Sequence, residues 1–176
     1  MADKQIVIVI DQPPVPRPAW VREAFEQADV FIAEPDEVGE IVKKDPEGAR
    51  ALRQTYLQRD AQHKVAPWYQ NAFAKLYAGK RRVGIYGGGW LNLLAPNVDA
   101  CIVDWDAMAR VTPEMSQKLT LDEIRETIDA GLAYGKSYVA ERQAELPGTA
   151  FFTLPDGIDD AQRTAQTVAF IRERFG

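Results

Sequence analysis

Short apolar runs alternate along the chain with longer amphipathic stretches. The first run, 6–10, reads IVIVI and ends at Asp11, as expected for a strand buried on both faces of a sheet. Similar runs predict further strands at 30–33, 82–86, 100–103 and 150–154. The segments between them, beginning with 18–28, carry apolar residues at helical spacing.

This alternation predicts an α/β fold with an open, mostly parallel sheet of five strands, or six, and helices on both faces. We expect a Rossmann-like or flavodoxin-like arrangement, because a complete eight-stranded barrel needs about 250 residues and this chain has 176. The length also predicts that residues 1–176 form a single α/β domain.

The segment 37–79 is too long for a plain connection between the second and third predicted strands. It is charged and helical in pattern, and the prolines in Asp45-Pro46 and Ala66-Pro67 are expected to interrupt it. We therefore predict a helical excursion of two or three helices within the domain.

The C-terminal third contains clear helix starts. Thr120 followed by Glu123 forms a predicted capping box, and Asp159 is expected to cap a last helix. Residues 132–140 fit either a helix or a strand, since Gly131 and Gly135 weaken the helical pattern. A helix is the favoured interpretation.

Composition narrows the classes of partner. The 26 acidic residues exceed the 21 basic ones, for a net charge of -5, so no basic surface for nucleic acid or an anionic membrane is expected. No apolar run approaches the roughly 20 residues of a membrane span, and no signal segment opens the chain. We expect a cytoplasmic protein whose partner is a small molecule.

Cys101 and His63 are the single cysteine and the single histidine. Together they cannot build the usual zinc sites, and no haem or nicotinamide signature is present. Cys101 falls inside a predicted strand, and no G-x-S-x-G elbow accompanies His63, so a catalytic role is not expected for either.

The sharpest candidate site follows the fourth predicted strand, at Asp104-Trp105-Asp106. In open parallel sheets ligands bind at the carboxyl ends of the strands. Asp104 and Asp106 could share a divalent cation, Mg²⁺ or Mn²⁺, or act without metal as an acid and a base. Either use needs a third acidic group, for which Asp11 and Glu34 are the candidates. A purely structural role in caps and turns stays open.

A second candidate site follows the third predicted strand. Gly87, Gly88 and Gly89 would let the backbone approach a ligand, and the helix after them would offer amides to an anionic group. A plain tight turn is the alternative, because the spacing matches neither dinucleotide-binding nor P-loop motifs. Three more residues are candidates for substrate binding: Trp90 and Trp105 would flank a ring, and Arg17 would meet an anion.

Two short stretches resemble pieces of known families. An acidic residue at a strand end followed by an apolar-D-x-D motif is similar to Toprim domains, although the strand here ends in Asp11 and not in glutamate. The phrase VGIYG at 83–87 with the later Asp104 is similar to parts of barrel-type glycoside hydrolases, whose barrel this chain is too short to form. Neither resemblance assigns a role to a residue.

We therefore expect a hydrolase or transferase that acts on a small polar substrate, anionic or ring-containing, through strand-end carboxylates with or without a divalent cation. One alternative is a glycoside-hydrolase-like enzyme that uses a carboxylate pair without metal. The other is a non-catalytic binding or assembly protein, such as a homodimer, that acts through aromatic residues of the excursion. These residues are Tyr56, Trp68, Tyr69, Phe73 and Tyr77.

Overall fold

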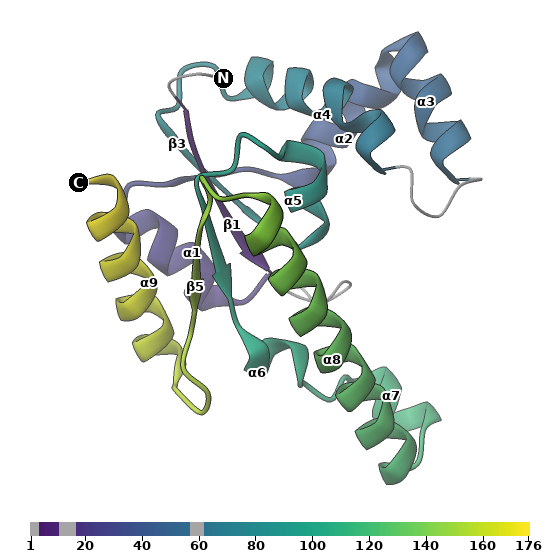
Figure 1. Ribbon diagram of the computed structural model, residues 1–176, viewed down its shortest axis with the longest axis vertical. Coiled ribbons are helices and arrows are strands. Elements are labelled where there is room, and N and C mark those ends of the chain that lie inside the picture. The colour runs from purple at the N-terminus through teal and green to yellow at the C-terminus, as the bar shows by residue number, and fades with distance from the viewer. Residues whose placement is uncertain (1–3, 11–16, 57–61) are drawn as a thin grey trace.

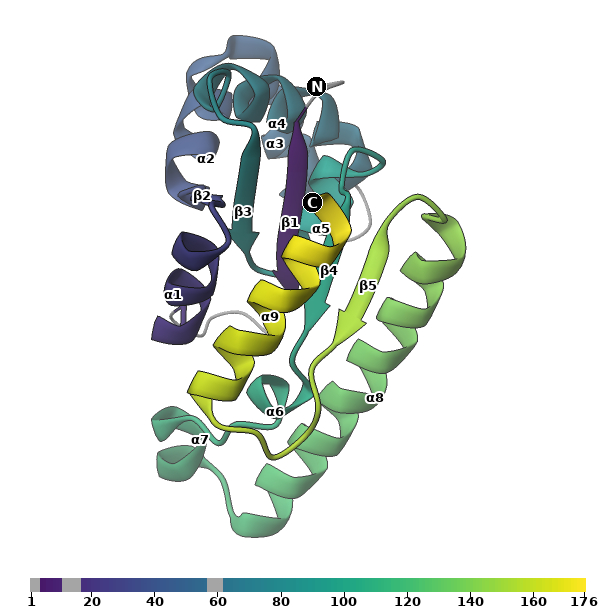
Figure 2. The ribbon, with the colours of Figure 1, turned by 90° about the vertical axis from the view of Figure 1, so that its left-hand side faces the viewer.

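A computed structural model describes residues 4–10, 17–56 and 62–176, and in these ranges five strands form one sheet between two layers of helices (Figure 1; Figure 2). All neighbouring strands are parallel, in the order β2-β3-β1-β4-β5. The predicted open parallel α/β fold is confirmed. The strands are β1 (Gln5–Ile10), β2 (Phe31–Ile32), β3 (Arg82–Tyr86), β4 (Ala100–Val103) and β5 (Ala150–Thr153).

The strand order differs from both arrangements that we expected. In the Rossmann order the second strand lies between the first and the third, and in the flavodoxin order the first lies between the second and the third. Here β3 lies between β2 and β1, and β4 pairs with the other side of β1. A single sequence shows where strands lie along the chain, but pairing is decided by contacts between distant segments.

Helices cover both faces of the sheet. On one face lie α1 and α9, which pack against each other, and on the other lie α2, α4, α5 and α8. In chain order the helices are α1 (Ala19–Gln27), α2 (Pro35–Lys44), α3 (Pro46–Tyr56), α4 (Gln62–Leu76), α5 (Gly89–Leu94), α6 (Trp105–Met108), α7 (Pro113–Lys118), α8 (Leu121–Glu145) and α9 (Asp160–Phe175).

The central strand β1 shows why the sheet is covered twice. Ile6, Ile8 and Ile10 are buried in the core under α2, α4, α5 and α8, whereas Val7 and Val9 are buried under α1 and α9. Successive side chains of a strand point to opposite faces, so an unbroken β-branched run needs an apolar layer on each side. The strand therefore sits at the centre of the molecule, as its sequence predicts.

Gly84 on β3 sets how closely α1 approaches the sheet. A Cβ atom at this position would lie 2.2 Å from Cε2 of Phe25, so the phenyl ring of α1 rests directly on the strand backbone. Phe25 is fully buried there. Because residue 84 has no side chain, α1 can lie close to the sheet, with Phe25 placed over this position of β3.

The described residues of the excursion form three helices, α2, α3 and α4, in agreement with the prediction of two or three. The chain breaks between α2 and α3 at Asp45-Pro46, as expected, but the predicted break at Ala66-Pro67 is wrong, since Pro67 lies inside α4. The carbonyl that Pro67 leaves unpaired belongs to His63, which is exposed and can be hydrated. The packing of α4 on the core outweighs the free-energy cost of a proline inside the helix.

The C-terminal helices largely follow the prediction. Residues 132–140 lie in α8, which begins with the predicted Thr120–Glu123 capping box, and Asp159 caps α9. At 25 residues, α8 is about 37 Å long, and together with α7 it projects beyond the carboxyl ends of the strands (Figure 2). The short helices α6 and α7 were not predicted. Among the described helices, none has the length and apolar content to cross a membrane.

Candidate functional site

The strand ends and the first residues of their connections form one edge of the sheet, which we call the carboxyl edge. The connection after β1 leads to α1 on one face, whereas those after its neighbours β3 and β4 lead to α5 and α8 on the other. Chains that leave adjacent strands toward opposite faces open a crevice at the strand ends, where α/β proteins bind ligands. The end of β1 is therefore the centre of the candidate site. Asp11, the predicted acidic residue after β1, lies outside the described residues.

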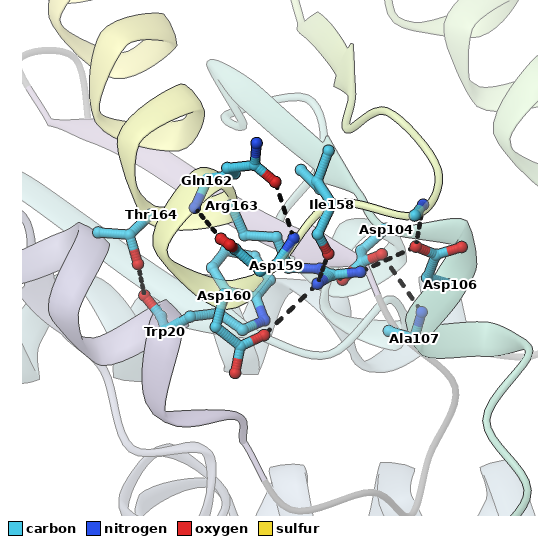
Figure 3. Close-up of polar contacts among 11 residues, drawn as sticks. Trp20, Asp104, Asp106, Ala107, Ile158, Asp159, Asp160, Gln162, Arg163 and Thr164 are labelled. Atoms are coloured by element: carbon cyan, nitrogen blue, oxygen red, sulfur yellow. Dashed lines mark hydrogen bonds and ion pairs between the residues drawn. The ribbon is translucent and has the colours of Figure 1, made fainter.

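Asp104 and Asp106 are both bound by Arg163 of α9 (Figure 3). Nε of Arg163 lies 2.9 Å from Oδ2 of Asp104, and Nη2 lies 2.9 Å from Oδ2 of Asp106. The same guanidinium also contacts Asp160 at 3.5 Å and donates to the carbonyl oxygen of Ile158. The guanidinium thus bridges the two carboxylates between which we predicted a metal ion.

The two carboxylates differ in their exposure to solvent. Asp104 is 2% exposed, and its Oδ1 accepts a hydrogen bond from the backbone N–H of Ala107, which caps α6. Asp106 has a side chain that is 33% exposed, and its Oδ2 also accepts from the backbone N–H of Gly157 at 2.7 Å. Its Oδ1 has no partner among the described residues. Of the predicted pair, only Asp106 presents an oxygen to solvent.

Arg163 is the residue that the sequence analysis missed. Its side chain is only 7% exposed, but no feature of the sequence separates it from Arg172 and Arg174 of the same helix, which bind carbonyl oxygens far from this site. A buried arginine is recognisable only once its carboxylate partners are brought to it by the fold.

Glu34 does not join the aspartates. It follows β2, whereas Asp104 follows β4, so three strand spacings of about 4.8 Å each, roughly 14 Å in all, separate their backbones. Glu34 instead pairs with Arg17 at 3.2 Å, and its backbone N–H donates to Oη of Tyr77. Burial raises the pKa of Tyr77. The predicted Arg17 and Glu34 thus form a second charged pair at the same edge.

The three glycines after β3 form a tight turn that leads into α5. Gly87 has φ 126°, a left-handed conformation that favours glycine, and its N–H donates to the carbonyl oxygen of Val9 on β1. Gly88 precedes α5, and the hydroxyl of Tyr138 on α8 lies 3.4 Å from its carbonyl oxygen. Gly89 is exposed, and a Cβ there would meet nothing within 4 Å. The backbone at Gly89 is therefore open to a ligand.

Tyr138 connects this turn to α8. Its hydroxyl lies 3.0 Å from Oδ1 of Asn92, and burial raises the pKa of Tyr138 to about 12. The phenol is therefore protonated at neutral pH and acts as a hydrogen-bond donor.

The two predicted substrate-binding tryptophans have separate surroundings. Trp90 makes an edge-on contact with Tyr69, with ring centres 5.5 Å apart. Trp105 begins α6, and Nζ of Lys136 lies 5.9 Å from the centre of its ring. Both indoles are partly buried against the core. They flank the carboxyl edge on the α5 and α8 side, and each ring contacts a different residue.

No group of three or more His, Cys, Asp or Glu side chains in ranges 4–10, 17–56 and 62–176 is placed to hold a metal ion. His63 is exposed at the start of α4. Cys101 is fully buried, and burial raises the pKa of its thiol to about 12, so it does not ionise near neutral pH.

Comparison with known proteins adds no assignment to this site. No protein-family model matches the chain, and no curated protein matches it. The chemistry of the carboxyl edge is therefore argued from its own geometry.

Proposed function

We propose that the protein binds a small polar substrate at the carboxyl edge, beside the end of β1, and acts on it as a hydrolase or transferase. The observation that carries the proposal is the connectivity around β1, whose helix lies on the face opposite to the helices that follow both of its neighbours. Such a switch point is where open α/β sheets bind their ligands. Gly87 to Gly89, Trp90, Trp105 and Arg17 border this position.

In this proposal Asp106 is the catalytic carboxylate. Arg163 and the N–H of Gly157 hold its Oδ2, which leaves Oδ1 to accept a proton from the substrate or from water. If Mg²⁺ or Mn²⁺ takes part, Asp106 would hold it largely through water, as Mg²⁺ is commonly held. Asp104 positions α6 and Arg163 and does not contact the substrate, because it is buried.

The two alternatives find less support. Phe73 and Tyr77 are buried at 0% and 3% exposure, and Trp68 and Tyr69 pack against the same core. These four aromatic residues therefore pack in the core of the protein, and their buried surface is not available to a partner chain. A metal-free carboxylate pair needs two accessible groups, whereas Asp104 is buried and paired with Arg163. The proposal includes a cytoplasmic location and a small-molecule partner, and the acidic composition disfavours nucleic acid and anionic membranes as partners.

The test begins with a thermal-shift screen of phosphate esters, nucleotides and sugars, with and without Mg²⁺ or Mn²⁺. A ligand that binds only the folded protein raises the melting temperature. Turnover of each hit is then compared in Asp106→Asn and in Asp156→Asn, an exposed carboxylate in the connection after β5. We expect the first variant to lose at least about a hundredfold in kcat, as for loss of a general base, and the second to match wild type.

Two glycine variants test the location independently of the reaction. A Cβ at Gly89 and one at Gly79 both meet nothing within 4 Å, but Gly79 precedes β3 at the opposite edge of the sheet. We expect Gly89→Ala to weaken ligand binding and Gly79→Ala to leave it unchanged. Equal affinity in both variants and in wild type would exclude the glycine turn from the site.

A further inference from the structure

Among the described residues, three buried side-chain donors on the α1 and α9 face have no hydrogen-bond partner. One is the hydroxyl of Thr167 in the interior of α9, and the other two are Nε1 of Trp20 and Oη of Tyr86. Trp20 is 1% exposed and belongs to the core that Tyr86 packs against. Since more than nine in ten buried polar groups in proteins are hydrogen-bonded, two unpartnered donors in one cluster call for an acceptor that the described residues do not supply.

Both donors lie at the level of the first turn of α1. The ring of Phe25 rests on Gly84. Tyr86 is two residues further along β3, about 6.6 Å toward the carboxyl edge. Val21 is one helical turn before Phe25, about 6 Å in the same direction, because α1 runs opposite to the strands that it connects. Tyr86 therefore stands beside the start of α1.

Trp20 is directed toward the same place. It is the second residue of α1, and helical side chains lean back over the turn that precedes them. Its indole thus lies around the N-terminus of the helix. From the α9 side, Thr164 donates to the carbonyl oxygen of Trp20 and holds this turn in position (Figure 3).

The N-terminus of α1 has no side-chain cap. Its N-cap is Pro18, no side chain accepts from its first amides, and no acidic residue occurs in its first turn. Of these amides, Val21 donates to the carbonyl of Pro18, while those of Ala19 and Trp20 have no intrahelical acceptor. Side chains cap α6, α7, α8 and α9, whereas α2 and α5 also begin without a side-chain cap.

Arg17 brings a positive charge to this turn. Arg17 immediately precedes Pro18, its side chain is 18% exposed, and Glu34 takes one of its nitrogens. Glu34 pairs with Arg17, and Asp160 at the start of α9 shares Arg163 with Asp104 and Asp106. Among the described residues, the donors for which no hydrogen bond is found are two amides, an indole N–H, a phenol and the remaining N–H groups of Arg17.

We propose that the N-terminus of α1, with Trp20, Tyr86 and Arg17, binds the phosphoryl group of a small ligand. A phosphoryl group supplies several acceptor oxygens and a negative charge, which suits a set composed only of donors at the positive end of a helix dipole. The inference deepens the proposed function, because it assigns the chemical class of the substrate's anionic group. It needs neither Asp106 nor the glycine turn.

The experiment measures binding of inorganic phosphate to the whole chain by calorimetry and by thermal shift, with chloride at matched ionic strength as the reference. We expect the melting temperature to rise with phosphate and not with chloride. Tyr86→Phe keeps the ring and should weaken phosphate binding about tenfold or more, the usual effect of losing a hydrogen bond to a charged group. Trp20→Phe should weaken it similarly, and Tyr134→Phe, on the exposed surface of α8, should not.

Tyr86→Phe also has a second readout that does not depend on correct folding of the Trp20 variant. Without phosphate, removal of an unpartnered buried hydroxyl should leave the melting temperature equal or higher. With saturating phosphate, wild type should become the more stable of the two. The proposal is overturned if phosphate shifts wild type no more than chloride does, or if Tyr86→Phe and wild type bind phosphate equally.

The outcome separates this inference from the proposed function. If phosphate binding fails while Gly89→Ala still weakens binding of a screened substrate, only the anion site is wrong. If phosphate binds as described but Asp106→Asn keeps full turnover, the anion site stands and the catalytic assignment fails.

Discussion

The two edges of the sheet use their charged residues differently. At the edge where the strands begin, which we call the amino edge, the helices α1, α4 and α9 end, and cations donate to their last carbonyl oxygens. At the carboxyl edge, where helices begin, carboxylates cap α6 and α9, but the starts of α1, α2 and α5 have no side-chain cap.

The amino edge is closed by these cations. Lys4 donates to the carbonyl oxygens of Tyr77 and Lys80, Arg82 donates to that of Phe175, and Arg172 donates to that of Gln27. Cations at helix C-termini satisfy unpaired carbonyls and oppose the helix dipole. The cationic side chains named here thus already donate to carbonyl oxygens of the fold. At the carboxyl edge, by contrast, the side chains of Trp20 and Tyr86 still have donors for a ligand.

The largest expected effect is at the carboxyl edge. Arg163→Met leaves the buried carboxylate of Asp104 without its cation, which should lower the free energy of unfolding by about 3–5 kcal/mol. Urea denaturation measures this change. Arg125→Met is the matched control, since Arg125 forms an exposed pair with Asp122 on α8 and should cost less than about 0.5 kcal/mol. Equal losses would show that the buried network adds nothing to stability.

The corresponding change at the amino edge should cost less. Arg82→Met removes hydrogen bonds to Phe175 and to Oε1 of Gln5, for about 1–2 kcal/mol by urea denaturation. The neighbouring Arg81 is exposed, and Arg81→Met should leave stability within about 0.5 kcal/mol of wild type. A larger loss in Arg82→Met than in Arg163→Met would reverse our ranking of the two edges.

The cap of α9 should contribute about 1 kcal/mol. Asp159→Ala removes the acceptor for the N–H of Gln162, and thermal or urea denaturation should register the loss. Asp160→Ala, one residue later, removes only a long ion pair to Arg163 and should cost about half as much or less. Indistinguishable variants would mean that the capping box does not stabilise this helix start.

The smallest effect is a pH dependence. In the unfolded chain Tyr138 ionises near pH 10, whereas in the folded protein its pKa is about 12 because it is buried. The unfolded state therefore loses the proton first, and stability falls as the pH rises from 10 to 12, by on the order of 1 kcal/mol after solvent screening. Denaturation of Tyr138→Phe should show a flatter profile over this range. Tyr134→Phe, which is 73% exposed, should follow wild type.

The fold was predictable to the extent that it depends on local pattern. The β-branched run of β1 and the capping box of α8 were read directly from the chain, because burial on two faces and cap hydrogen bonds each constrain the residue types nearby. Strand order and the continuation of α4 through Pro67 were not, since both depend on contacts between segments far apart in the sequence.

The candidate site was predictable only in its location. Asp104, Asp106 and Glu34 do stand at strand ends, but the distance of Glu34 from the aspartates follows from the strand order. The role of Arg163, 59 positions after Asp104, follows from the packing of α9. The side chains of Trp20 and Tyr86 could not be predicted to lack a hydrogen-bond acceptor, because the fold decides which groups surround them.

Gly84 links the stability of the core to the recognition of a ligand. Any side chain at this position would push against the ring of Phe25 and lift α1, and the start of that helix would move with it. A chain of the same fold with a larger residue at 84 would need a smaller one at 25, so the two positions should vary together. Selection for ligand binding would then also preserve Gly84, a buried residue that does not contact the ligand.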